Sequence, residues 1–299
     1  MLLLPKFDYE EPRSMHEALR IFSELKRRAK VIAGGTDILV NMKKGVISPE
    51  RLVSLRRIDM LRGVDAKKTA IEIGSHVTVS ELASSGMITR SLPALAAAAS
   101  SLGSPLVRNR ATIGGNIVTA RPAADLPPAL MVLGAKVELK GKGKKRMVPL
   151  DEFFRGPGST VMDDDEVLTK IVIPGAPPFT GSDYMKLGHR ATLEIAIVAV
   201  ASRITLDKPD GSIKDARVVL SAVAPKAIHS VCAERMLVGK RPSEELFAEA
   251  AKAAMDDASP IDDIRGGAAY RREMISVLTQ RTLSQALKSA RAGKAGGAQ

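Results

Sequence analysis

The chain has no tryptophan, a single cysteine and few aromatic residues of any kind. Aromatic residues make up 3% of its 299 residues, so we expect the hydrophobic cores to consist of aliphatic side chains. The lone Cys232 excludes an internal disulfide, a cysteine-based zinc site and an iron–sulfur cluster ligated by this chain alone. We expect Cys232 to be buried as a small hydrophobic residue.

Metal-ligand patterns and long apolar segments are also lacking. The four histidines are scattered along the chain without an H-E-x-x-H motif or another close spacing, so we expect no metal site. No segment approaches the roughly 18 uninterrupted apolar residues of a membrane span. The N-terminal Met1–Pro5 is too short for a signal peptide. We therefore expect a cytoplasmic protein with no membrane span.

Acidic residues are fewer than basic ones, which leaves a formal net charge of +12. Net charge alone does not choose between nucleic acid, an anionic cofactor and an acidic partner subunit. The densest basic run, Lys140–Arg146, lies between two strand-like segments without aromatic residues nearby. This pattern is typical of a solvated hairpin rather than of a nucleic-acid surface. We expect no nucleic-acid partner, and a basic nucleic-acid-binding or scaffold protein is the least favoured interpretation.

Two loops with paired glycines follow apolar runs, roughly eighty residues apart in the chain. The first is Val31-Ile-Ala-Gly-Gly-Thr-Asp-Ile38 and the second is Ala111-Thr-Ile-Gly-Gly-Asn116. Glycine accepts positive φ and has no Cβ, so consecutive N–H groups can converge on a phosphate. Either loop alone could be an ordinary tight turn, but their recurrence favours a cofactor held from two sides. Neither has the G-x-G-x-x-G or Walker A pattern, which indicates another nucleotide-binding fold.

The order of the expected elements divides the chain into two parts. Ser14-Met-His-Glu17 predicts a capping box that opens a helix ending near Lys26. The proline-rich segment Pro174–Pro178 marks the expected boundary. Beyond it, three strands followed by three helices predict an α+β domain. The expected strands are 184–187, 195–206 and 212–223, and the expected helices are 228–238, 243–254 and 267–290.

Together with three later motifs, the glycine loops resemble the FAD-binding medium subunit of the molybdenum hydroxylase family, which includes xanthine dehydrogenase and carbon monoxide dehydrogenase type enzymes. The later motifs are Ala123-Ala-Asp-Leu-Pro127, the strand Glu166–Pro174 and Tyr184-Met-Lys-Leu-Gly-His-Arg190. The resemblance runs nearly end to end.

This resemblance implies an α+β fold in two domains. A two-lobed FAD-binding domain of the vanillyl-alcohol-oxidase (PCMH) type would cover residues 1–174, with lobes of about 1–57 and 58–174. A domain like the C-terminal domain of carbon monoxide dehydrogenase flavoproteins would follow over 179–291, with a three-stranded antiparallel sheet and three helices. Residues 292–299 would form a flexible tail.

The resemblance also implies which residues bind FAD. Gly34 and Gly35 would offer backbone donors, Asp125 would accept a hydrogen bond from the cofactor, and Lys186 would come from the second domain. Two alternatives stay open, because Asp125 and Asp37 could be only helix N-caps and Lys186 only a solvated strand end. The implied set is Val31, Ile32, Ala33, Gly34, Gly35, Thr36, Asp37, Ile38, Leu102, Thr112, Gly114, Gly115, Asn116, Thr119, Asp125, Leu168 and Lys186.

The function implied by the resemblance is that of an electron-transfer subunit of an oxidoreductase. A large partner would carry the molybdenum cofactor and a small partner the [2Fe–2S] clusters, while FAD on this chain would pass electrons to NAD, a quinone or a small carrier. No catalytic residue is assigned, since the cofactor performs the chemistry. The alternative is a self-sufficient flavin oxidoreductase, with His189 or Tyr184 as acid or base. Arg121 stands where many family members carry a small residue, and it could meet a cofactor phosphate, an electron acceptor or a partner subunit.

Overall fold

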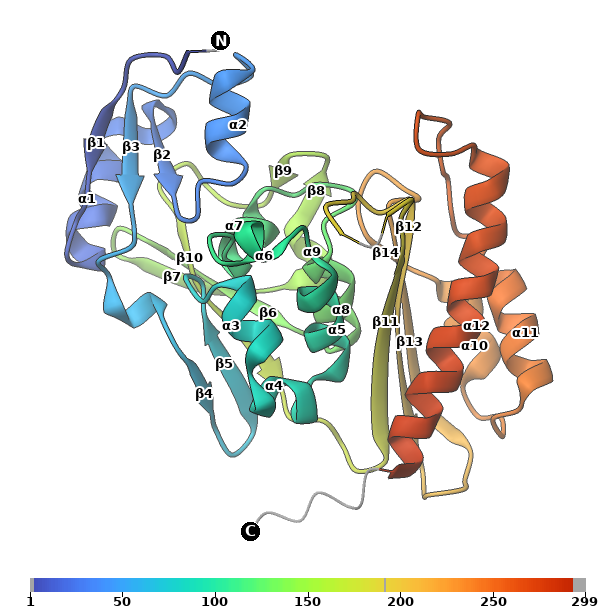
Figure 1. The fold of residues 1–299 in the computed structure, drawn as a ribbon. Coiled ribbons are helices and arrows are strands. Elements are labelled where there is room, and N and C mark those ends of the chain that lie inside the picture. Colours follow the sequence, from blue (N-terminus) through green and yellow to red (C-terminus); the bar gives the residue numbers. More distant parts are fainter. Residues whose placement is uncertain (1–2, 191, 293–299) are drawn as a thin grey trace.

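The computed structural model describes residues 3–190 and 192–292, and it consists of two lobes followed by a C-terminal domain (Figure 1). Residues 293–299 of the expected flexible tail lie outside the described residues. Within the described part of the chain, no helix combines the length and the apolar content that crossing a bilayer requires. The expected α+β architecture is confirmed.

The first lobe is built on a three-stranded parallel sheet. Ser14 caps its first helix by accepting the Glu17 N–H at 3.2 Å, as predicted. The Glu17 carboxylate accepts the N–H of Arg13 at 2.9 Å, one residue before the position that a capping box requires. The sheet order is β1-β3-β2, and the elements are β1 (Asp8–Glu10), α1 (Met15–Leu25), η1 (Lys26–Arg28), β2 (Ala29–Ile32), α2 (Ile38–Lys43) and β3 (Arg51–Ser54).

The second lobe is an antiparallel sheet of order β4-β5-β10-β6-β7 on which a group of short helices packs. Its core is aliphatic, as the composition predicts, with Phe153, Phe154 and Tyr184 as the aromatic members among the described buried residues. The elements are η2 (Asp59–Leu61), β4 (Val64–Ala66), β5 (Ala70–Gly74), α3 (Val79–Ser84), α4 (Gly86–Ser91), α5 (Pro93–Ser101), α6 (Pro105–Arg108), α7 (Ile113–Val118), α8 (Leu126–Val132), β6 (Lys136–Gly141), β7 (Lys144–Pro149), α9 (Leu150–Phe153), β8 (Phe154–Gly156), β9 (Ser159–Thr160) and β10 (Val167–Pro174).

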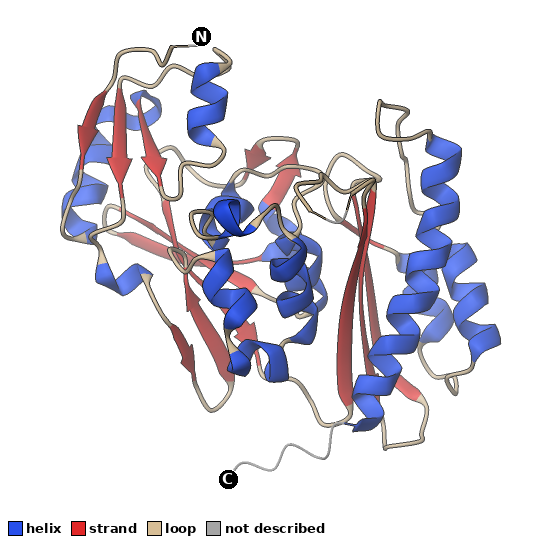
Figure 2. Cartoon of the chain, in the orientation of Figure 1, coloured by secondary structure: helices blue, strands red, loops and turns tan. Residues whose placement is uncertain are grey.

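The C-terminal domain has the three expected strands and three expected helices, together with one short additional strand (Figure 2). The expected helix 228–238 begins only at Val231, because Ser230 caps it and the two preceding residues pair with β13 as β14. The elements are β11 (Thr180–Leu187), β12 (Val198–Leu206), β13 (Ile213–Ser221), β14 (Ile228–His229), α10 (Val231–Leu237), α11 (Glu244–Ala253) and α12 (Ala268–Ala292).

The sheet of the C-terminal domain is covered on both faces, by its own helices on one side and by the second lobe on the other (Figure 1). Because side chains alternate along a strand, Tyr184 packs into the core of the second lobe while its neighbour Met185 packs against the helices. Helix α12 approaches β11 closely, since a Cβ on Gly181 would lie 2.1 Å from the carbonyl oxygen of Ala286. The sheet thus holds β11 directly beside helix α5 of the second lobe.

Two expectations about individual residues have different outcomes. The basic run forms the β6–β7 hairpin as predicted, but Lys144 lies 2.9 Å from Asp163 and Arg146 lies 2.8 Å from the buried Glu166.

Cys232 is exposed, so the expectation that it is buried is wrong. The buried positions of α10 are Ala233 and Leu237, one turn apart, and Cys232 lies off that face.

His229 joins the C-terminal domain to the second lobe through two carboxylates. Its Nδ1 lies 2.7 Å from Glu234 of α10, and its Nε2 lies 3.2 Å from Asp151 of α9. Burial alone would lower the pKa of His229, but the hydrogen bonds and charges of the two carboxylates raise it to about 9. The imidazole is therefore protonated at neutral pH and bridges the two domains.

We expect this bridge to weaken as the pH rises. The folded-state pKa of about 9 lies above the ordinary value of about 6.5, so the stabilisation is complete below about pH 6.5 and is lost through about pH 9. His229→Gln should lower the free energy of unfolding by up to about 3 kcal/mol near pH 6 and by almost nothing near pH 10. Urea denaturation across this range measures the difference.

The matched control is His16→Gln, because His16 is exposed on α1 and forms no such bridge with any residue that the structure describes. A loss of stability in His229→Gln that is the same at every pH would contradict the bridge, as would an equal loss in the control.

Candidate functional site

The first glycine loop lies against the backbone that leads into the second. A Cβ on Gly34 would lie 1.9 Å from the carbonyl oxygen of Arg110 and 3.0 Å from the Cα of Ala111. Only glycine fits there, because the clash would be with backbone rather than with a movable side chain. Gly35 has a φ of +78°, a conformation that also favours glycine. The structure thus brings the two loops together at the contact between the lobes.

The first loop carries a row of backbone donors without acceptors. Among the described residues, no hydrogen bond is donated by the N–H groups of residues 34–37. Asp37 stands at the N-cap position of α2, but its side chain makes no capping hydrogen bond. Ala33, Thr36 and Ile38 are half-buried around these donors. Backbone N–H groups of this kind require an acceptor such as a phosphate oxygen or water.

The second glycine pair has a different geometry from the one expected. Gly114 and Gly115 lie in the first turn of α7 without positive φ. The Gly114 N–H donates to the Ser75 carbonyl at 2.9 Å, and the Gly115 N–H donates to the Thr112 hydroxyl at 3.1 Å. The expectation that these two N–H groups converge on an anion is therefore wrong, because both are satisfied within the lobe. Gly114 is needed for packing, since a Cβ would lie 2.7 Å from the Ser75 oxygen.

Two polar residues after this pair also have internal partners. The Asn116 Oδ1 accepts the Leu126 N–H at 3.3 Å, and the Thr119 hydroxyl donates to the Gly115 carbonyl at 2.6 Å. Asn116 therefore supplies the side-chain acceptor at the start of α8. Asp125 stands at the N-cap position of α8, but its side chain makes no capping hydrogen bond there.

Asp125 is instead held by the C-terminal domain. Its Oδ1 accepts from the Lys186 Nζ at 2.9 Å and from the Tyr184 hydroxyl at 3.1 Å. The side chains of Asp125 and Lys186 are only 11% and 8% exposed, so the solvated alternative for Lys186 is wrong. Lys186 also donates to the Ser101 carbonyl at 3.2 Å, beside the buried Leu102. These contacts join α5, α8 and β11 at one buried point.

Burial decides the protonation of this cluster. It raises the pKa of Asp125, and the Lys186 charge and the two hydrogen bonds offset that rise only in part. It also raises the pKa of Tyr184 well above its usual range, so the hydroxyl stays protonated and donates to Asp125. Among the described residues, no hydrogen bond reaches the Asp125 Oδ2. This oxygen is free to accept from a ligand.

Leu168 lies close to the second loop through a chain of backbone hydrogen bonds. The carbonyl of Thr169, its neighbour in β10, accepts the Ser75 N–H at 3.0 Å, and Ser75 in turn accepts from Gly114. The sequence gives no signal for Ser75 or for the Arg110 backbone. Both make their contacts through main-chain atoms, which every residue type has. The Tyr184 contact did have one, because Tyr184 and Lys186 are two residues apart on a strand and share a face.

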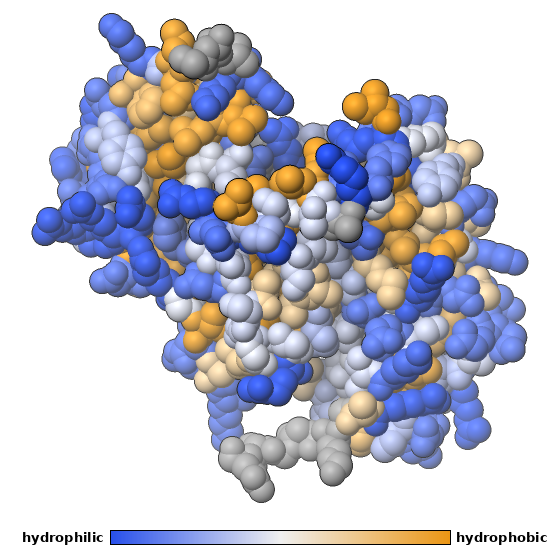
Figure 3. All heavy atoms as spheres, viewed as in Figure 1, coloured by the Kyte–Doolittle hydropathy of each residue, from blue (hydrophilic) through white to orange (hydrophobic). Residues whose placement is uncertain are grey.

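Arg121 bridges the two lobes near the same site. It donates to the Asn41 side chain of α2 at 3.1 Å and follows Ala120, whose φ is +47°. In the space-filling view, apolar side chains gather on the first lobe around α2, where Val40 and Val46 are exposed (Figure 3). The surface is hollowed between this lobe and the C-terminal domain (Figure 3). The predicted residues therefore lie along the contact of three structural units.

Comparison with known proteins gives matches along nearly the whole chain. The family model described as the FAD binding domain in molybdopterin dehydrogenase matches residues 5–176. The model described as the CO dehydrogenase flavoprotein C-terminal domain matches residues 183–286. The carbon monoxide dehydrogenase medium chain of Hydrogenophaga pseudoflava is 34% identical over 95% of this chain and 98% of its own length.

Other relatives extend this similarity. The xanthine dehydrogenase FAD-binding subunit of Escherichia coli O157:H7 is 28% identical over 94% of this chain and 96% of its own length. A solved structure of carbon monoxide dehydrogenase from Hydrogenophaga pseudoflava superposes with a TM-score of 0.92 at 34% identity, covering 96% of this chain and 99% of that one. The chain therefore belongs to the family of FAD-binding medium subunits of carbon monoxide dehydrogenase and xanthine dehydrogenase type oxidoreductases.

Proposed function

We propose that this chain is the electron-transfer subunit of a molybdenum-containing hydroxylase or dehydrogenase complex. A large partner carries the molybdenum cofactor and a small partner carries the [2Fe–2S] clusters, and electrons leave through FAD to an external acceptor. The observation that carries the proposal is the contact of Gly34 with the backbone before the second loop, within a domain of the FAD-binding family. The names of the relatives, which are medium chains or subunits, support the partners.

The residues present fit FAD. The free N–H groups of residues 34–37 suit the oxygens of its diphosphate, which carries negative charge and needs several donors. The Asp125 Oδ2 suits a polar hydrogen on the edge of the flavin ring, and the buried Leu102 supplies apolar surface. FAD, when bound, supplies both hydride and one-electron chemistry.

The chain's own residues then have positioning roles. Lys186 holds one oxygen of Asp125, so the carboxylate keeps a single orientation and presents its other oxygen to a ligand. Tyr184 contributes a second hydrogen bond to the same oxygen. Because α5, α8 and β11 enclose these groups, water is largely excluded from the cluster.

The two alternatives have less support. A self-sufficient oxidoreductase needs an acid or base, but the Tyr184 hydroxyl is committed to Asp125. Its raised pKa makes it a weak acid and keeps it protonated, so it is not available as a base. His189 is exposed and lies outside the buried cluster. A nucleic-acid-binding role is weakened by the hairpin, where Lys145 also lies 2.8 Å from the carboxylate of Glu138.

The function is tested by purifying the chain from its host through a gentle affinity tag. We expect absorbance bands near about 370 and 450 nm from FAD, together with two partners that bind molybdenum cofactor and iron–sulfur clusters. Flavin without partners would favour a free-standing oxidoreductase. A colourless protein that cannot be reconstituted with FAD would contradict the proposal.

We expect Gly34→Ala to lose FAD, because its Cβ cannot lie 1.9 Å from the Arg110 carbonyl oxygen and the first loop must move. The ratio of flavin absorbance to protein absorbance measures the loss. The matched control is Gly86→Ala at the start of α4, where the nearest atom to a Cβ is the end of the Arg90 side chain at 3.4 Å. Equal FAD content in the two variants would count against the loop as the FAD site.

The cluster around Asp125 allows the structural and cofactor roles to be separated. Asp125→Asn should lower the free energy of unfolding by roughly 3 kcal/mol, because Lys186 is left buried without a counter-charge. Asp125→Asn with Lys186→Met should recover much of that stability, since no buried charge remains. If Asp125 binds FAD, the double variant stays deficient in FAD despite its recovered stability. Chemical denaturation and flavin content measure the two effects.

Asp165→Asn serves as the control for removing one carboxylate, because Asp165 is only half-buried in the acidic turn before β10 and pairs with the exposed Lys144 at 3.3 Å. Full FAD content in the double variant would limit Asp125 to a structural role.

A further inference from the structure

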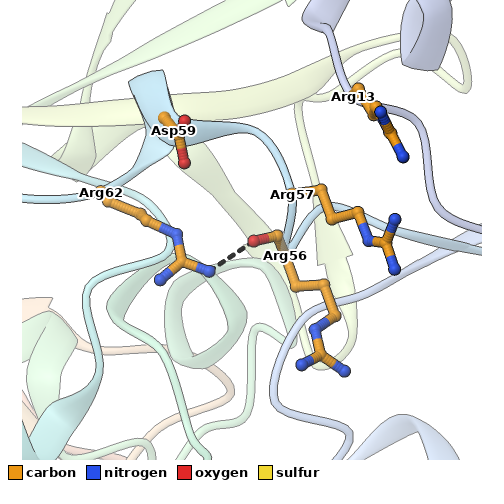
Figure 4. Close-up of a pocket in the computed structure, with 5 residues that line it drawn as sticks. All are labelled: Arg13, Arg56, Arg57, Asp59 and Arg62. Atoms are coloured by element: carbon orange, nitrogen blue, oxygen red, sulfur yellow. Dashed lines mark hydrogen bonds between the residues drawn. The ribbon is translucent and has the colours of Figure 1, made fainter.

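Four arginines line an open cavity of about 640 Å³ beside the first lobe (Figure 4). The lining consists of Arg13, Arg56, Arg57, Arg62 and the single carboxylate of Asp59. All five residues are exposed, and no apolar or aromatic side chain takes part. A cavity lined only by charged groups recognises a ligand by its charge rather than by its apolar surface.

The position of these arginines follows from the topology of the parallel sheet. Arg13 follows the carboxyl end of β1, and Arg56 and Arg57 follow the carboxyl end of β3. The first glycine loop follows the carboxyl end of β2, the third strand of the same sheet. Ligands of parallel α/β sheets bind outside the carboxyl ends of the strands. The arginines therefore occupy the half of this edge that the glycine loop leaves uncovered.

The positive charge of the cavity is only partly neutralised. Arg57 lies 2.8 Å and Arg56 lies 3.8 Å from the same carboxylate, that of Glu11. Arg62 donates to the backbone carbonyl of Arg56 (Figure 4). Within residues 3–190 and 192–292, no carboxylate forms an ion pair with Arg13 or Arg62. Four guanidinium groups thus face two carboxylates, those of Glu11 and Asp59.

The positive potential reaches the second lobe. The pKa of His76 is lowered by burial and further by the charges of Arg62, Arg110 and Arg56. These charges come from both sides of the lobe contact, since Arg110 precedes the second glycine loop. An anion placed in the cavity would therefore lie in a field built by both lobes.

We propose that this arginine cavity binds a diphosphate group. Planar guanidinium groups form paired hydrogen bonds with phosphate oxygens, and an excess of positive charge in one cavity matches two adjacent phosphates. An acidic peptide would spread its charges along an extended chain, whereas these four arginines lie around a single cavity. The diphosphate belongs to a separate nucleotide or to inorganic pyrophosphate, because the free N–H groups of residues 34–37 already serve the FAD diphosphate in the proposed function. The site itself stands on the charges and does not require the proposed function.

The test is calorimetric titration of the full-length protein with inorganic pyrophosphate at low ionic strength, in the FAD-loaded and FAD-free forms. We expect saturable binding to both forms, and we expect Arg13→Gln to weaken it about tenfold by removing one charge-assisted pair. Arg13 is chosen because its side chain has no ion-pair partner among the described residues, so its removal spares the fold. The control is Arg20→Gln, an exposed arginine of α1 paired with Glu24 at 3.5 Å.

The two forms distinguish the sources of the diphosphate. Binding to the FAD-loaded protein that Arg13→Gln weakens indicates a separate ligand. Binding only to the FAD-free protein, with a lower FAD content in Arg13→Gln, would place the diphosphate of FAD in the cavity and would overturn the proposal of a separate ligand.

Three further results would overturn the proposal. The first is no saturable binding to either form, and the second is equal affinity in the wild-type protein, Arg13→Gln and Arg20→Gln. The third is binding of a glutamate-rich peptide without binding of pyrophosphate, which would assign the surface to a protein partner. Each of these can occur while FAD and the partner subunits are still recovered on purification, so failure of the site is distinguishable from failure of the proposed function.

Discussion

The buried ion pair between Asp125 and Lys186 is the interaction on which the arrangement of the domains depends. It joins α8 to β11, and its two side chains are almost completely removed from solvent. A charge buried in this way is costly unless a partner is near, so removing either residue destabilises the other. The requirement that both charges stay together therefore fixes the first strand of the C-terminal domain against the FAD-binding family domain. The Tyr184 hydroxyl and the Ser101 carbonyl complete the hydrogen bonding of the pair.

A second constraint is steric. At two positions the backbone packs so closely that only glycine, which has no Cβ, fits. Gly34 and Gly114 each lie where a Cβ would meet a backbone carbonyl oxygen, of Arg110 in one case and of Ser75 in the other. The two glycine pairs are alike in sequence but differ in consequence. The first leaves its N–H groups without acceptors, whereas the second uses them to pack α7 onto the lobe. Only the first pair is therefore equipped to donate to an anion through its backbone.

Much of the fold could be predicted from the sequence, because capping residues, proline and apolar periodicity act locally. The helices starting at Met15 and Glu244 and the strand β13 lie where these patterns indicate. What could not be predicted depends on distant segments. The β1 strand forms only by pairing with β3, more than forty residues away, and the partners of Asp125 come from another domain. A short polar residue before a helix is typical of a cap, so the sequence alone could not separate capping from a buried ion pair at Asp125.

The protonation of the site limits what this chain can do chemically. Around Asp125, the groups that could exchange a proton are committed, since the hydroxyl of Tyr184 and the ammonium of Lys186 both donate to the same carboxylate oxygen. A residue held in this way orients a ligand well but transfers protons poorly, because its hydrogen bond must break first. Chemistry in such a site has to be supplied by a bound cofactor. This cluster therefore does not select the organic substrate. That agrees with the proposed function, in which this subunit positions FAD and a partner oxidises the substrate.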